Sequence, residues 1–103
     1  MTPDEKLKAE LELADVKSVM SLPAGRRFVW SLLDACGVWS ASFRESSQRL
    51  SDVLEGRRSV GLMLMQHLQQ KLAREYSAMV LEAAQAEADE LARRDLEAAK
   101  TDP

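Results

Sequence analysis

Two arginine doublets, Arg26-Arg27 and Arg57-Arg58, are the polar residues of this sequence with the clearest chemical meaning. The planar guanidinium group of arginine matches both carboxylate and phosphate oxygens, so each doublet is a candidate partner- or phosphate-contacting site. We favour carboxylates as the partners. The candidate carboxylates are Asp34, Asp52, Glu55 and the acidic residues of a neighbouring subunit beyond Glu82.

The residue types that most often act as nucleophile, general base or metal ligand occur once each, as Cys36 and His67. Cys36 has no base near it in the sequence and falls on an apolar helical stripe, which predicts a small core residue. His67 has no cysteine, histidine or carboxylate cluster at ligand spacing, so we interpret it as a surface or helix-contact residue. The sequence also lacks a phosphate-binding glycine loop. We therefore expect no catalytic residue, no metal site, no cofactor and no small-molecule substrate, and we expect the protein not to be an enzyme.

The composition is that of a small folded protein. Its 103 residues are 46% hydrophobic and 30% charged, which argues against disorder throughout the chain. The formal net charge is -3, but the middle of the chain is mildly basic and both ends are acidic. This charge distribution is too weak for a general nucleic-acid binder and suits head-to-tail association between copies. With one cysteine, no signal-peptide pattern and no apolar run long enough for a membrane span, the sequence predicts a soluble protein made in a reducing cytoplasm.

Helix-start and helix-stop residues divide the first third of the chain. Residues 2–5, Thr-Pro-Asp-Glu, have the pattern of a capping box and predict a helix from there towards Met20. Proline disfavours helical geometry at the preceding residue, so Pro23 ends this helix and begins a second one. Gly37 is the expected left-handed residue that ends the second helix. The apolar side of that helix is formed by Phe28, Val29, Leu32, Leu33 and Cys36.

Two aromatic residues, Trp39 and Phe43, lie in an ordered loop expected over residues 38–46, and two more, Phe28 and Trp30, lie in the second helix. We interpret the four as an aromatic clamp, a small core for the short helices, rather than as a stacking platform for single-stranded nucleic acid. The clamp residues are Phe28, Trp30, Trp39 and Phe43.

A third helix is predicted from about residue 47 to 72, with Ser46 or Ser47 as its N-cap. A glycine inside a helix costs about 1 kcal/mol relative to alanine, so two glycines in this segment indicate close approach of another backbone. We expect the second helix to cross the third near Gly25 and Gly56, which would bring the two arginine doublets together. The helix-crossing residues are Gly25, Gly56 and Gly61, and the apolar face of the third helix is Leu50, Val53, Leu54, Arg57, Gly61, Leu64, Leu68 and Leu72.

No proline or glycine occurs between Leu72 and Pro103, so the sequence leaves open whether the third helix continues. A bend near residues 73–76 and a fourth helical segment over about residues 74–99 are the expectation. Residues at heptad-like spacing in this segment predict an oligomer seam that packs on a partner in an assembly. The seam residues are Leu81, Ala84, Ala88 and Leu91.

The order of these motifs resembles a small protein family of tailed bacteriophages, the podophage family named after a Bordetella phage reading frame. The resemblance spans about residues 15–81 and is carried by residues 23–30, 35–38, 42–43 and 55–62. It implies a structural or virion-associated phage protein encoded among head and portal genes, without enzymatic activity. Relatives tend to have a proline-containing break where this chain has residues 71–76, Lys-Leu-Ala-Arg-Glu-Tyr.

These observations predict an all-α fold of three to four helices, with a central helical hairpin and extended N- and C-terminal helices. We expect a single helical domain over residues 1–103, with a core at about 15–81 and an acidic, alanine-rich helical tail at about 82–103. The expected function is a non-enzymatic tailed-phage structural protein, an internal, portal-proximal virion or ejection component that homo-oligomerises. It would be made in the bacterial host cytoplasm, dock on other head, portal or ejection proteins, and lie in the head interior or portal region of the virion. The alternative is a DNA-binding or DNA-packaging accessory factor that uses Arg26, Arg27, Arg57 and Arg58.

Overall fold

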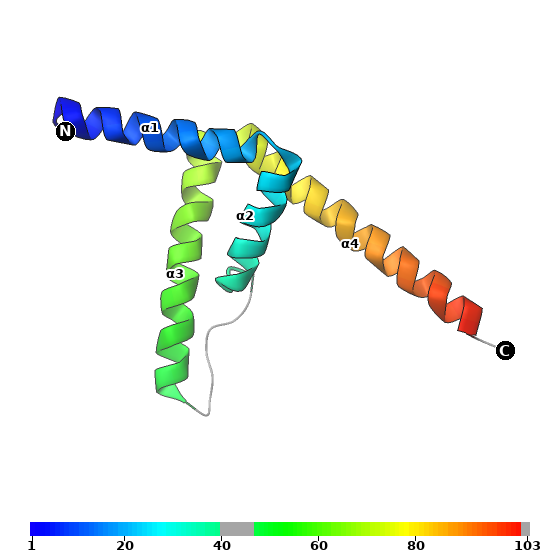
Figure 1. Ribbon diagram of the computed structural model, residues 1–103. Helices are drawn as coiled ribbons and strands as arrows, with labels where there is room; N and C mark the ends of the chain where they lie inside the picture. Colours follow the sequence, from blue (N-terminus) through cyan, green and yellow to red (C-terminus); the bar gives the residue numbers. More distant parts are fainter. Residues whose placement is uncertain (40–46, 102–103) are drawn as a thin grey trace.

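The computed structural model describes residues 1–39 and 47–101, and this part of the chain forms four α-helices (Figure 1). They account for 89% of the described residues, among which there is no strand, so the predicted all-α class is confirmed. The helices are α1 (Pro3–Met20), α2 (Pro23–Ala35), α3 (Gln48–Lys71) and α4 (Ala73–Thr101).

The helices meet at one end of the predicted hairpin. α2 and α3 run antiparallel, α1 crosses the end at which α2 begins and α3 finishes, and α4 leaves that end in a third direction (Figure 1). The molecule measures 70 × 39 × 15 Å and has a Cα radius of gyration of 18.3 Å. A compact chain of this length would have a radius of gyration of about 13 Å, so the helices project as arms from a small centre.

The predicted helix ends are formed by local hydrogen bonds. The Thr2 hydroxyl accepts from the Glu5 amide at 3.1 Å and the Thr2 amide donates to the Glu5 carboxylate at 3.3 Å, which completes the capping box. Ser47 caps α3 by accepting from the Leu50 amide at 3.0 Å. Gly37 has φ +76°, so the left-handed turn predicted after α2 is confirmed.

A single non-helical residue, Leu72, separates α3 from α4. Its φ of -135° and ψ of 51° lie outside the helical region, although its amide still bonds to the Leu68 carbonyl at 2.8 Å. The break therefore lies one residue before the bend expected at residues 73–76. No proline or glycine causes it, and we attribute it to packing, because the turn lets Leu68, Leu72 and Met79 all enter one core.

The core lies where the four helices meet. Four of its side chains are fully buried: Met20 from α1, Leu33 from α2, Leu68 from α3 and Met79 from α4. Val29, Val38 and Leu72 complete the buried apolar cluster. Away from this junction burial is lost, and residues 1–12 and 91–101 are exposed throughout.

Candidate functional site

Two glycines lie at close contacts between helices. A Cβ atom at Gly61 would lie 2.6 Å from Val38 Cγ2 and 2.7 Å from Cys36 Cβ, so the missing side chain lets α3 approach the end of α2. A Cβ atom at Gly25 would collide with the carbonyl oxygen of Val19 at the end of α1. The missing side chain of Gly25 therefore allows α1 and α2 to come close where they are connected.

The structure does not bring Gly25 and Gly56 together, so the crossing expected at these two residues is wrong. A Cβ atom at Gly56 would have no atom of the described structure within 4 Å beyond its own helix and chain neighbours. The physical reason is length: α2 has only 13 residues and ends beside Gly61, so α3 continues past it. Gly56 lies in the part of α3 that projects beyond α2.

Arg26 holds three helices together. Its Nε donates to the Glu82 carboxylate of α4 at 2.5 Å, and its Nη1 donates to the Met20 carbonyl at the end of α1 at 2.9 Å. The Arg26 side chain is only 15% exposed. Sequence reasoning placed Glu82 at the edge of a neighbour's acidic tail, and no local signal connects residues 56 positions apart.

The other doublet is separate from the first. Gly61 packs against Cys36, so Arg57 lies one turn beyond the end of α2, whereas Arg26 lies in its first turn. At 1.5 Å per residue the doublets are about 20 Å apart along α2, and the expected common patch is wrong. Arg58 lies 3.7 Å from Glu55 on the same helix. Arg27 and Arg57 are exposed and form no ion pair with the described residues, so their contact to carboxylate or phosphate stays a prediction.

Of the four clamp residues, the structure brings two together. The rings of Trp30 and Trp39 stack with centroids 4.9 Å apart and an interplanar angle of 27°. Phe28 is 65% exposed and lies on another side of α2, so its place in the clamp is wrong. Phe43 lies outside the described residues.

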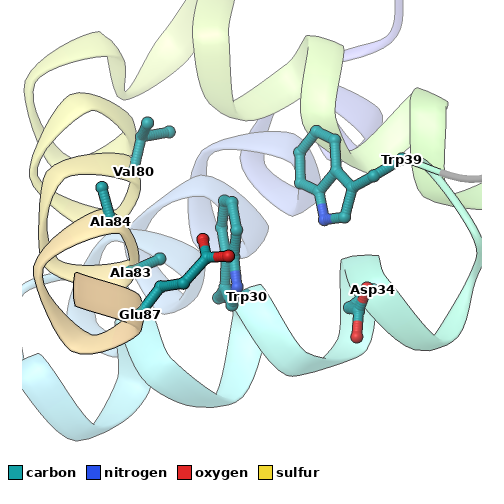
Figure 2. Close-up of a pocket in the computed structure, with 7 residues that line it drawn as sticks. All are labelled: Trp30, Asp34, Trp39, Val80, Ala83, Ala84 and Glu87. Atoms are coloured by element: carbon teal, nitrogen blue, oxygen red, sulfur yellow. The ribbon is translucent and has the colours of Figure 1, made fainter. Parts of the chain in front are cut away.

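A groove of about 450 Å³ opens between α2 and α4 beside the stacked tryptophans (Figure 2). Its lining combines apolar side chains with two carboxylates, Asp34 of α2 and Glu87 of α4. Glu87 points across the groove toward Trp30 (Figure 2). Within residues 1–39 and 47–101 no group of three or more His, Cys, Asp or Glu side chains is placed to hold a metal ion. The groove lining is Trp30, Asp34, Trp39, Val80, Ala83, Ala84 and Glu87.

The two residues singled out for chemistry lie apart. Cys36 is half-buried against Gly61. His67 is exposed on α3. None of the described helices is both long and apolar enough to cross a membrane.

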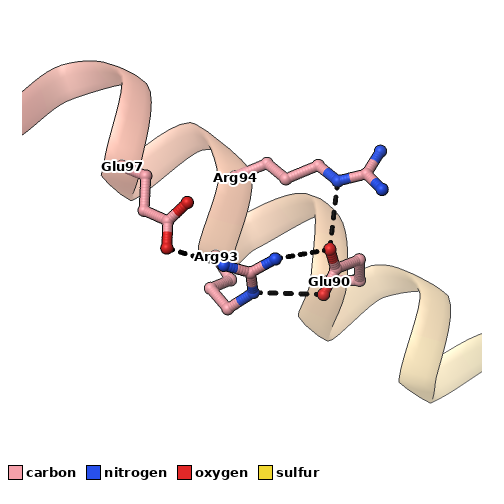
Figure 3. A network of polar contacts seen from close by, with 4 residues as sticks. All are labelled: Glu90, Arg93, Arg94 and Glu97. Carbon is pink, nitrogen blue, oxygen red and sulfur yellow. Dashed lines mark hydrogen bonds and ion pairs between the residues drawn. The ribbon is translucent and has the colours of Figure 1, made fainter. Parts of the chain in front are cut away.

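The distal half of α4 carries a network of ion pairs along one side of the helix (Figure 3). Arg93 bonds to Glu90 at 2.7 Å and to Glu97 at 2.6 Å, and Arg94 bonds to Glu90 at 3.0 Å. Hydrogen bonding to Arg93 lowers the pKa of the Glu90 carboxyl below its ordinary value. These pairs stabilise the helix locally. Residues 81–92 of α4 contain no lysine or arginine.

Exposed apolar side chains outnumber buried ones in this structure. The accessible surface is 7973 Å², whereas a compact monomer of this mass exposes about 5,800 Å². The excess is therefore about 2,200 Å². The predicted oligomer seam contributes to it, since Leu81 is 71% and Leu91 53% exposed and the two seam alanines, Ala84 and Ala88, are exposed. Sequence reasoning missed Val60 and Met63, which are 63% and 70% exposed on α3.

The fold and its surface define a small all-α protein whose helices project from a minimal core, and its relatives are phage proteins. A family model described as Bbp19-like phage protein matches residues 16–81. The chain therefore belongs to the Bbp19-like phage protein family, and the resemblance expected from the sequence is confirmed. The match covers α2, α3 and the first turns of α4, and it leaves most of α1 and the distal part of α4 outside. No curated protein and no solved structure gives a significant match to the chain.

Proposed function

We propose that this phage protein is a non-enzymatic structural subunit of a tailed-phage particle that acts by binding further copies of itself. The observation that carries the proposal is the excess of about 2,200 Å² of accessible surface over a compact monomer. Stable interfaces bury about 800 Å² per partner, and obligate ones bury more. The excess is sufficient for two such contacts on each copy.

Within this class, we propose an internal, portal-proximal virion or ejection component that docks on head, portal or ejection proteins. Support comes from the family, from the projecting helices and from the segregated charge, with acidic ends and a mildly basic middle. Subunits with unlike ends associate head to tail, and head-to-tail contacts that close generate rings. A ring around the portal is the arrangement that such a subunit suits.

The arginines give less support to DNA binding than to this structural role. The Arg26 side chain already forms hydrogen bonds with Glu82 and with a backbone carbonyl, and Arg58 lies beside Glu55. The two doublets are also too far apart to form one phosphate-binding patch. Arg27 and Arg57 form no ion pair with the described residues, so their double alanine variant tests the alternative. We expect no change in salt-dependent DNA affinity, and a loss of that affinity would favour DNA binding.

Quantitative mass spectrometry of purified virions tests the proposal. We expect the protein in every particle at a fixed copy number that is a multiple of six or twelve. A matched measurement on the major head protein calibrates the count. Absence of the protein from purified virions would overturn the virion role, and a variable copy number that follows the packaged DNA length would favour a DNA-coating role.

A further inference from the structure

Two exposed helix faces in this chain have matching residue spacing. On α3, Val53, Gly56, Val60 and Met63 follow one another at intervals of three, four and three residues, and we call them the α3 stripe. The seam predicted on α4 has the same intervals and consists of Leu81, Ala84, Ala88 and Leu91. Residues at these intervals lie on one face of a helix and form the contact layers of paired helices.

The geometry points to a heterologous contact between copies: we propose that the α4 seam of one copy packs antiparallel on the α3 stripe of a second copy. This inference rests on the proposed self-association and assigns the two surfaces that would carry it. Both surfaces carry exposed apolar side chains, with Val53 48%, Met63 70% and Leu81 71% exposed.

An antiparallel pairing places the two sets of residues in register. Val53 lies opposite Leu91, Val60 opposite Ala84, and Met63 opposite Leu81. The remaining layer pairs Gly56 with Ala88, the two smallest side chains, which allows the helix axes to come close. This layer gives a reason for a glycine in the middle of α3, where a Cβ atom would have no atom of another described helix within 4 Å.

Opposite charges at one end of the two surfaces favour pairing α4 with α3 and favour the antiparallel direction. Four residues before Val53 and four residues after Leu91, the next layer of the same pairing places Arg49 of α3 opposite Asp95 of α4. Neither side chain forms an ion pair with the described residues of its own chain. Pairing two α4 seams would gather acidic residues of both copies, and like charges placed together disfavour association.

Acidic residues also lie beside the two surfaces that we propose to pair. Glu87 flanks the α4 seam and forms no ion pair with the described residues, whereas Arg93 and Arg94 are engaged on the other side of α4. Asp52, beside the α3 stripe, accepts a hydrogen bond from Gln48 at 2.8 Å. The α4 seam is therefore acidic and apolar, and the N-terminal end of the α3 stripe presents Arg49 to it.

The same chain cannot supply this partner. At 100° per residue the α4 seam lies on the side of α4 opposite Met79, which points into the core of its own copy. One non-helical residue joins α3 to α4, whereas helices that fold back on each other need a loop of about 2–5 residues. In Figure 1 the two helices diverge from the junction. Each copy thus offers one stripe and one seam, a pair of unlike surfaces that forms a ring or a filament.

Disulfide trapping tests the pairing in the full-length chain with Cys36 replaced by alanine. One copy carries Val53→Cys and a tag that changes its mass, and the other carries Leu91→Cys. After mixing and mild oxidation, we expect the mixed disulfide as the main cross-linked product. The matched control replaces Leu91→Cys with Leu81→Cys, which would face Val53 only in a parallel pairing and should cross-link much less.

The outcomes separate this inference from the proposed function. Preferential cross-linking through Leu81→Cys would overturn the antiparallel pairing. Oligomers without either cross-link would overturn the stripe-and-seam contact while leaving self-association standing, and a monomer at all concentrations would overturn both.

A charge exchange gives an independent test of direction. Arg49→Asp or Asp95→Arg alone should weaken association by about tenfold or more, because a like-charged pair replaces an opposite one. The double variant Arg49→Asp with Asp95→Arg should recover the lost affinity, with circular dichroism confirming that each variant folds. Failure of the double variant to recover affinity would contradict the predicted Arg49–Asp95 contact.

Discussion

At the junction of the four helices, Met20, Leu33, Leu68 and Met79 are fully buried, whereas Leu81, Leu91 and Leu96 on α4 are more than half exposed. Large apolar side chains occur in both regions, so their presence alone does not distinguish the two. They differ in what covers them: side chains from all four helices pack together at the junction, whereas Leu81 faces away from it and no other described helix covers the distal half of α4. The junction is thus the part of the protein that folds by intrachain packing. The arms are surfaces whose apolar side chains remain available to a partner.

Truncation of one buried and one exposed leucine should affect stability very differently. Leu68→Ala should lower the free energy of unfolding by about 2–5 kcal/mol, because it leaves a cavity where four helices meet. Leu91→Ala should change it by less than about 0.5 kcal/mol at concentrations where the protein is monomeric. Urea denaturation followed by circular dichroism measures both. Equal losses would mean that α4 is covered within a single copy.

The two glycines of α3 should respond to substitution in opposite ways, because Gly61 lies in the junction and Gly56 lies in an arm. Gly61→Ala should destabilise the fold by about 1–3 kcal/mol, since its Cβ would collide with Val38 and Cys36. Gly56→Ala should stabilise the monomer by up to about 1 kcal/mol, since alanine is the better helix former and has free space there. Thermal unfolding of the two variants should therefore shift in opposite directions. A destabilised Gly56→Ala monomer would contradict the open environment of Gly56.

Substitution of Arg26 measures how much its bond to Glu82 of α4 contributes to the stability of the fold. Arg26→Ala removes the bonds to Glu82 and to the Met20 carbonyl and should cost about 1–2 kcal/mol, the lower part of the range for hydrogen bonds of charged groups, because Glu82 is partly exposed. Arg57→Ala, on the projecting part of α3, should change stability by less than about 0.5 kcal/mol. Chemical denaturation of both variants provides the comparison. A larger effect at Arg57 than at Arg26 would reverse the assignment of the two doublets.

The smallest effect is expected in the tail, from the pH dependence of its ion pairs. Because hydrogen bonding to Arg93 lowers the pKa of Glu90, ionised Glu90 stabilises the helix fully above its ordinary pKa near 4.5. This contribution is lost as the pH falls through the lowered value, when the carboxyl becomes protonated. Helicity measured between pH 6 and pH 3 should therefore decline less in Glu90→Gln than in the unchanged protein. A pH profile that Glu90→Gln leaves unaltered would show that the network does not stabilise the tail.

Local chemistry made the helix ends predictable. The Thr2–Glu5 capping box, Pro23, Gly37 and Ser47 act within one turn of themselves, and each begins or ends a helix as expected. The break at Leu72 was predicted less closely, since it depends on packing in the junction and no breaker residue marks it. Both glycines of α3 were expected at a helix crossing, but only Gly61 contacts the end of α2. Gly56 does not, because α2 is too short to reach it.

The candidate site was harder to predict than the fold. The pairing of Arg26 with Glu82 joins helices far apart in sequence, and only the direction in which α4 leaves the junction brings these residues together. Exposure of Val60 and Met63 was also not evident, because a helical stripe in the sequence does not show which of its sides a neighbouring helix covers. Heptad spacing did predict the α4 seam, and its occupation by a partner stays a prediction.

We expect further copies of this chain to cover the exposed arms. Sedimentation equilibrium of the full-length protein over a range of micromolar concentrations measures this directly. We predict an average mass above 11.5 kDa that rises with concentration towards a multiple of that value. In Gly56→Leu, which blocks the close layer of the pairing, the average mass should return towards the monomer value. A mass of 11.5 kDa at every concentration would contradict the account.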